Sequence, residues 1–104
     1  MTPQSAIAML DRQIAAHGQD ISFRSGSTTH SARGFVRGYK PEQLVGLITQ
    51  QDRSVIVSPS SLAGYVPTAQ DDFQTMGQLG KVVAAEPIAV AGVIVRWNLT
   101  VRLV

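Results

Sequence analysis

The chain has 104 residues, of which 15% are charged, a formal net charge of +2 and no cysteine. This length is that of one domain, which we expect to span residues 1–104. The lack of cysteine excludes disulfides, thiolate metal sites and cysteine nucleophiles, and the net charge is small for a dedicated nucleic-acid-binding protein. The longest uncharged apolar run, residues 87–95, is far shorter than the roughly 20 residues of a membrane-spanning helix, so we expect no membrane contact.

The charged share is low against about 25% in typical proteins. Two interpretations stay open at this point: part of the surface is covered by a partner, or a small β domain takes its polarity from neutral groups.

Residues 3–17 predict an N-terminal helix. Thr2 is placed to cap it, Pro3 suits the first helical position, and Gly18 is expected to end it in the left-handed conformation. An apolar stripe with spacings of three and four residues completes the pattern: Ile7, Leu10 and Ile14.

The rest of the chain reads as strands, from about residue 19 to residue 104. The first two are expected after Gly18 and over residues 28–39, where Gly34 and Gly38 indicate a bulge or bend and where Phe35, like Phe23, belongs to the core. Further strands are expected at residues 44–50, 52–58, 73–76, 81–86 and 93–104.

Two features of the second half complete the fold prediction. Residues 58–72 predict a long loop, and the strict alternation over residues 93–104 makes Trp97 an anchor of the core. The expected fold is mainly β: a small five- to six-stranded barrel or sandwich with one N-terminal α-helix.

No constellation of residues predicts catalysis, a cofactor site or a metal site, so we expect no enzyme. His17 reads as a helix-end residue and His30 as a solvent-facing strand residue. The adjacent carboxylates Asp71 and Asp72 are the pattern of a cation site or an acid–base pair, but a solvated loop is favoured because no third ligand lies nearby in sequence.

Four basic residues gather within residues 24–40. Arg33 and Arg37 are four positions apart in a predicted strand and are expected to share a face. A solvated polar face is the favoured interpretation, and contact with phosphates or an acidic partner is the alternative. The candidate DNA-facing residues are Arg24, Arg33, Arg37 and Lys40.

The order of features along nearly the whole chain supports a resemblance. The helix is followed by residues 19–21 (QDI) and 32–36 (ARGFV), then by 51–59 (QDRSVIVSP), a long loop, 78–83 (QLGKVV), Pro87 and 95–102 (VRWNLTVR). In this order the chain resembles the head–tail joining (head completion, tail attachment) proteins of tailed bacteriophages, most closely the lambda type. It departs from that family at residues 71–77 (DDFQTMG), where a compact Gly-Asp-type turn is usual.

The resemblance implies a structural virion protein that forms a ring, taken as hexameric, at the head–tail junction, after assembly in the host cytoplasm. The implied partners are other copies of the chain, a portal or adaptor protein, a tail terminator or tail tube, and DNA that passes through the lumen without specific binding. The loop implied to touch a partner supplies seven candidates: Ser60, Leu62, Tyr65, Val66, Gln70, Asp71 and Asp72.

Two alternatives remain open from the sequence. One is a small basic nucleic-acid-binding β-barrel, which the four basic residues favour. The other is a tail-terminator ring protein of the same particle, which has no distinguishing feature in the chain.

Overall fold

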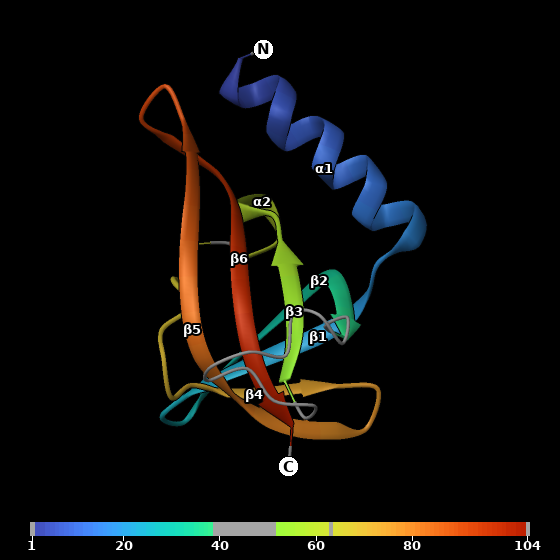
Figure 1. Cartoon of the computed structure of the whole chain (residues 1–104), viewed down its shortest axis with the longest axis vertical. Helices are drawn as coiled ribbons and strands as arrows, with labels where there is room; N and C mark the ends of the chain where they lie inside the picture. The colour runs from blue at the N-terminus through green and yellow to red at the C-terminus, as the bar shows by residue number, and fades with distance from the viewer. Residues whose placement is uncertain (1, 39–51, 63, 104) are drawn as a thin grey trace.

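A computed structural model of the chain describes residues 2–38, 52–62 and 64–103 (Figure 1). In these residues six strands close into a barrel in the order β1-β2-β3-β6-β5-β4, preceded by one long helix. The prediction of a mainly β fold with a five- to six-stranded barrel and an N-terminal helix is confirmed. Within the described ranges no helix is long and apolar enough to cross a membrane.

Helix α1 (Pro3–His17) begins as the sequence predicts. The hydroxyl of Thr2 accepts a hydrogen bond from the backbone N–H of Ser5 at 3.1 Å, and Pro3 occupies the first turn. Of the predicted apolar stripe only Ile14 is fully buried, at 4% exposure. The C-terminal half of α1 is therefore the part that packs closely against the barrel.

The prediction that Gly18 ends α1 in the left-handed conformation is wrong. This residue has φ −82° and ψ −179°, which is extended backbone and not the left-handed conformation. A glycine is needed there because a Cβ atom would lie 2.6 Å from the carbonyl oxygen of Ile14 and 3.0 Å from that of Gly34. Close approach of two chain segments, not an unusual φ, requires glycine at this position.

Strands β1 (Gln19–Ser25) and β2 (Thr28–Gly38) form an antiparallel hairpin, and β2 then pairs with β3 (Asp52–Val57). Gly34 is the residue at which β2 changes neighbour, since it lies opposite both Gln19 and Val57. A Cβ on Gly34 would lie 2.6 Å from the carbonyl oxygen of Ile56. The predicted strand at residues 44–50 lies outside the described residues.

The long loop predicted over residues 58–72 is partly ordered as secondary structure. It opens with a short helix, α2 (Pro59–Leu62), and its last residue belongs to β4 (Asp72–Thr75). The helix forms because Ser58 accepts hydrogen bonds from Ser60 and Ser61 at the first turn and because a proline occupies the first helical position.

The last two strands are long. β5 (Gln78–Val90) runs well past the predicted end at residue 86 and includes Pro87, and β6 (Val93–Leu103) begins where predicted. Ala91 and Gly92 join them with φ values of 51° and 79°, as in the tight hairpin turns that match strand twist. The predicted strand ended at residue 86, but β5 continues through Pro87, because at that point β6 is its only partner among the described strands and its other edge tolerates a proline.

Alternation along β6 places its odd-numbered residues from Trp97 to Val101 in the barrel interior. Trp97 is a core anchor, as predicted, at 8% exposure, and the same core contains Phe23 and Phe73, whose ring centres lie 5.6 Å apart. Phe35 was expected in the core and is not there. It lies on the opposite face of β2 from Val36, where the guanidinium of Arg37 stands 5.6 Å from its ring centre.

Unequal strand lengths leave a two-stranded ribbon beyond the barrel. β6 pairs with β3 only from Trp97 to Arg102, and β5 pairs with β4 only up to Lys81. Residues 88–96, which we call the arm, continue as a ribbon above the barrel, beside α1 (Figure 1). Two exposed apolar residues lie near its tip, Val93 and Ile94.

The close approach at Gly34 gives a test of the fold. Gly34→Ala is expected to lower the free energy of unfolding by about 2 kcal/mol or more, because the added methyl group meets backbone that cannot move without breaking the β2–β3 pairing. Gly38→Ala in the same strand is the control, because a Cβ there meets nothing within 4 Å, and it should change stability by less than about 1 kcal/mol. Urea denaturation measures both, and equal effects would contradict the argument.

Candidate interaction surfaces

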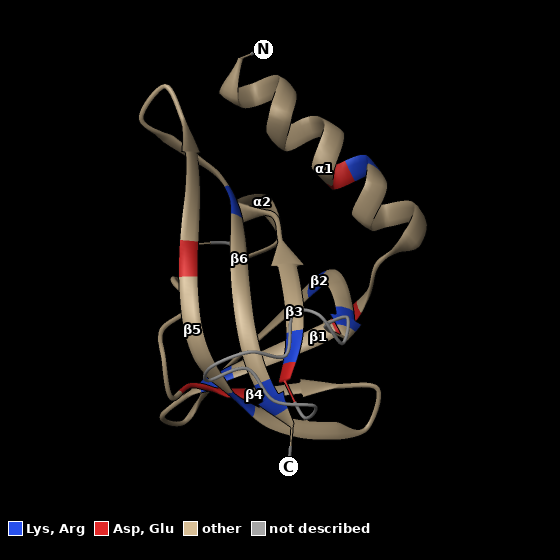
Figure 2. Cartoon of the chain, in the orientation of Figure 1, with Lys and Arg blue, Asp and Glu red and all other residues tan. Residues whose placement is uncertain are grey.

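A row of charged residues crosses the base of the barrel. Figure 2 shows that the positions of acidic and basic residues gather there, near the ends of β3, β4, β5 and β6. The members are directly opposite one another on five neighbouring strands: Asp52, Arg102, Lys81, Asp72 and Arg24. We call this set the charged row.

Ion pairs within the charged row balance most of its charge. Arg102 donates from Nε to Asp52 Oδ1 at 2.8 Å and from Nη2 to Oδ2 at 3.3 Å, and the Asp52 side chain is 1% exposed. Lys81 Nζ lies 2.6 Å from Asp72 Oδ1. With two carboxylates against three cations, this surface is mixed in sign and not a strongly basic patch.

The predicted basic residues do not converge on one site. Arg33 and Arg37 lie on the outer face of β2, as predicted, while Arg24 lies at the base in the charged row and donates to the carbonyl of Gly26 at 3.1 Å. Lys40 lies outside the described residues.

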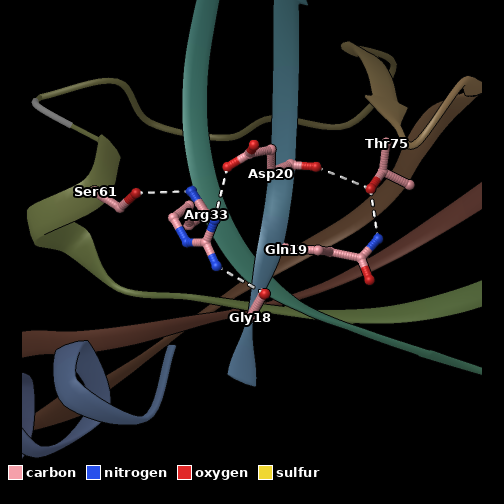
Figure 3. Close-up of polar contacts among 6 residues, drawn as sticks. All are labelled: Gly18, Gln19, Asp20, Arg33, Ser61 and Thr75. Carbon is pink, nitrogen blue, oxygen red and sulfur yellow. Dashed lines mark hydrogen bonds and ion pairs between the residues drawn. The ribbon is translucent and has the colours of Figure 1, made fainter. Parts of the chain in front are cut away.

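Arg33 holds the end of helix α1 in place through its hydrogen bonds (Figure 3). Its guanidinium donates to Asp20 Oδ1 at 2.9 Å and to the carbonyl oxygen of Gly18 at 2.8 Å, while its backbone N–H donates to Ser61 Oγ at 2.9 Å. The next residue along, Gln19, donates to Thr75 Oγ1 at 2.6 Å. These bonds tie the end of α1 to β1, β2, α2 and β4.

The seven residues predicted for partner contact divide into buried and exposed members. Leu62 is buried in the core cluster and Asp71 is buried against its own loop, while Tyr65 is half-buried. The members that present a surface are Ser60, Val66, Gln70 and Asp72. Partner contact by this set stays a prediction, and among its exposed members Val66 is the one large apolar side chain.

The expectation that Asp71 lies in a solvated loop is wrong, because its side chain is buried. Its Oδ2 accepts hydrogen bonds from the Tyr65 hydroxyl, from Thr68 Oγ1 at 2.9 Å and from the Thr68 backbone N–H at 3.2 Å. Its backbone pairs with Val82 of β5. Asp72 instead faces outward to Lys81, so the two carboxylates do not form a pair.

Burial and hydrogen bonding set the pKa values of this network. Burial acts to raise the pKa of Asp71, but the hydrogen bonds from Tyr65, Thr68 and Ser25 outweigh it and hold that pKa below its usual value. Burial, reinforced by the hydrogen bond to Asp71 and its negative charge, raises the pKa of Tyr65 above its usual value. The tyrosine is therefore neutral and the aspartate ionised at neutral pH.

The two histidines lie on different elements, His17 on α1 and His30 on β2. His30 was expected to face solvent, but it points inward along β2 and stacks on Tyr65 with ring centres 4.2 Å apart. His17 is exposed in the last turn of α1, as predicted. In the ranges that the structure describes, no three His, Asp or Glu side chains come close enough to hold a metal ion.

A groove between α1 and the arm was missed by the sequence analysis. It holds about 260 Å³ and is lined mainly by apolar side chains, with Arg96 at one side. Two signals were available: the uncharged run at residues 87–95 and the helix stripe, but nothing in the sequence brings them together. The main lining residues are Ala6, Met9, Leu10, Ile88, Val95 and Arg96.

The Tyr65–Asp71 hydrogen bond yields a pH-dependent prediction. Tyr65→Phe is expected to lower the free energy of unfolding by about 1–2 kcal/mol at pH 7, because a buried carboxylate loses a donor. The lowered pKa of Asp71 means that its contribution is complete above the ordinary carboxyl pKa of about 4 and is lost as pH falls through the folded value.

The difference between wild type and Tyr65→Phe should therefore shrink at pH 3. Urea denaturation at pH 7 and pH 3 measures it, with Ser60→Ala in the same loop as a control that should match wild type at both. A difference of equal size at the two pH values would contradict this assignment.

Compared with known proteins, the chain gives no significant match to a protein-family model, to a curated protein or to a solved structure.

Proposed function

We propose that the chain is a structural assembly subunit that forms a ring at the head–tail junction of a tailed phage or phage-like particle. The observation that carries the proposal is the projection of two elements, α1 and the arm, from one end of a closed barrel. Both present apolar side chains to solvent: Met9 on the helix and Val93 and Ile94 on the arm. A barrel whose core is complete without these residues has them available for a partner.

The arrangement of charge supports a ring that lets DNA pass. The charged row lies at the base of the barrel, whereas residues 2–10, at the start of α1, and residues 87–95, which include most of the arm, contain no charged side chain. Surfaces of different character at different places on the subunit suit head-to-tail contacts, which close into rings. A lumen lined by a balanced row such as Lys81 with Asp72 would retain DNA less strongly than a basic one.

Imaging of particles tests this proposal. In particles assembled with a labelled copy of the chain, we expect label between the portal and the tail, and we expect filled heads and separate tails when the chain is omitted. Label at the distal end of the portal alone favours head completion, and label at the tail end alone favours a tail terminator. Label elsewhere, or joined particles without the chain, contradicts the proposal.

A nucleic-acid-binding barrel is the second candidate. It is favoured by the placement of Arg24, Arg33 and Arg37 on the outer faces of β1 and β2. The bonds of Arg33 to Asp20 and Gly18 weigh against it, since they leave less of that guanidinium for phosphates.

Salt-dependent DNA binding separates the two candidates. The ring subunit should bind duplex DNA weakly at 50 mM salt, with a log Kd against log salt slope that Arg37→Gln reduces by no more than about 1. Fluorescence anisotropy with a duplex of mixed sequence measures it. Submicromolar binding with a slope of several units would favour the nucleic-acid-binding barrel instead.

A further inference from the structure

A hollow on the outer face of the barrel lies beside the charged row, over strands β1, β2, β4 and β5. It holds about 390 Å³, which is within the range of about 300–1,000 Å³ that is usual for ligand sites. Its polar side chains come from all four strands: Ser22, Arg24, Thr29, Asp72, Gln74 and Lys81.

The register of the strands brings these side chains onto one face. Thr29 and Asp72 lie directly opposite Arg24, one on each side of it. Ser22 precedes Arg24 by two residues in β1 and therefore faces the same way, and Gln74 lies opposite Ser22. Because neighbouring strands are about 4.8 Å apart, the polar groups form two short rows next to each other.

Arg24 is held in position but is not paired with a carboxylate. Its Nε donates to the carbonyl oxygen of Gly26 at 3.1 Å, in the turn between β1 and β2. Among the described residues its two terminal nitrogens have no acceptor, because the opposite carboxylate, Asp72, is paired with Lys81 Nζ at 2.6 Å. The remaining N–H groups form the planar fork that binds phosphate or carboxylate oxygens.

The neutral polar groups around Arg24 can donate as well. The hydroxyls of Ser22 and Thr29 and the side-chain amide of Gln74 each carry a donor. Within the part of the chain that the structure describes, these three side chains are engaged in no hydrogen bond. An oxyanion in the hollow would therefore meet one unmatched positive charge and several neutral donors.

The other lining residues favour the backbone of a nucleic acid over its bases. Phe73 lines the hollow, but its ring belongs to the core and is 1% exposed, so the described lining presents no ring on which a base could stack. Leu79 is 56% exposed and offers an apolar contact for the carbon atoms of a sugar. Contacts to phosphate and sugar do not depend on base sequence.

We propose that this hollow binds one backbone phosphate of duplex DNA through Arg24, and that Asp72 keeps the contact weak by holding Lys81 and repelling the phosphate. The inference rests on the proposed ring at the head–tail junction, and it assigns the outer face of β1 and β4 to the DNA channel. A single attenuated phosphate contact per subunit retains DNA loosely, which suits a duplex that must slide.

An acidic protein segment fits the hollow less well. A carboxylate presents both of its oxygens in one plane and is satisfied by the fork of Arg24 alone. A tetrahedral phosphate also presents oxygens outside that plane, toward the hydroxyls of Ser22 and Thr29 in the two rows.

Removal of the Arg24 charge tests the contact. Arg24→Gln is expected to weaken binding of a mixed-sequence duplex at least about threefold at 50 mM salt, and to reduce the slope of log Kd against log salt by about 1, as loss of one phosphate contact does. Arg37→Gln is the matched control, since it removes the same charge from β2 outside the hollow. Fluorescence anisotropy from about 50 to about 200 mM salt measures both variants. Equal effects of the two overturn the inference.

A variant that gains affinity makes the test independent of any loss of folding. Asp72→Asn removes the repelling charge and releases Lys81, so it should tighten binding at least about threefold and steepen the slope by about 1. The control Asp20→Asn removes the same charge and releases Arg33, which lies outside the hollow. No tightening by Asp72→Asn, or equal tightening by the two variants, overturns the inference.

Competition separates phosphate from carboxylate as the bound group. A glutamate oligomer with the same number of charges as the duplex is added to the complex of labelled duplex and wild-type chain. We expect it to displace the duplex only weakly. An oligomer that binds more tightly than the duplex, and loses that affinity in Arg24→Gln, indicates an acidic protein partner and overturns the inference.

Failure of the phosphate site is separable from failure of the proposed function. Label at the head–tail junction, with equal effects of Arg24→Gln and Arg37→Gln, leaves the ring assembly in place and removes only the phosphate site. An effect specific to Arg24, with label absent from the junction, retains the phosphate site and removes the junction.

Discussion

The pairing of β1 with β4 closes the barrel, and the other features of the molecule follow from that closure. Only four residue pairs make it, from Ile21 opposite Thr75 to Arg24 opposite Asp72. Once the sheet is closed, the short strands β3 and β4 set the height of the barrel. β5 and β6 are longer than that height, so they must continue outside it as the arm, and α1 is held beside them by the bonds around Arg33.

Closure also dictates where the loop before β4 must run. In the barrel order, β3 and β4 are separated by two strands in either direction, so residues 58–71 cross from one side to the other. Leu62 and Tyr65 pack on the core during this crossing. The buried Asp71 then fixes the end of the crossing through Tyr65 and Thr68, and its backbone joins β5 at Val82. A carboxylate in this position orders the loop through its hydrogen bonds to Tyr65 and Thr68.

Sequence patterns predicted the elements whose cause is local. The cap at Thr2 and the alternation through Trp97 depend on neighbours in the chain, and both are present. The wrong predictions concern residues whose surroundings are set by segments far away in the sequence. Pro87 is tolerated because β5 has lost one neighbour, and Asp71 is buried because Tyr65 reaches it. Gly18 is needed because the carbonyl oxygen of Gly34, as well as that of Ile14, lies too close for a Cβ atom. The groove was not predictable for the same reason, since its two walls lie some eighty residues apart in the sequence.

The division of the surface into unlike regions is the feature that most constrains assembly. A subunit with one self-complementary patch forms a two-fold dimer and stops, whereas unlike patches generate rings or filaments. Here the charged row binds its own members in ion pairs, and the groove between α1 and the arm is lined mainly by apolar side chains, with Arg96 at one side. The charged row and the apolar groove therefore lie in different parts of the molecule. The barrel packs its own core, and the groove between α1 and the arm is an apolar surface that lies outside that core.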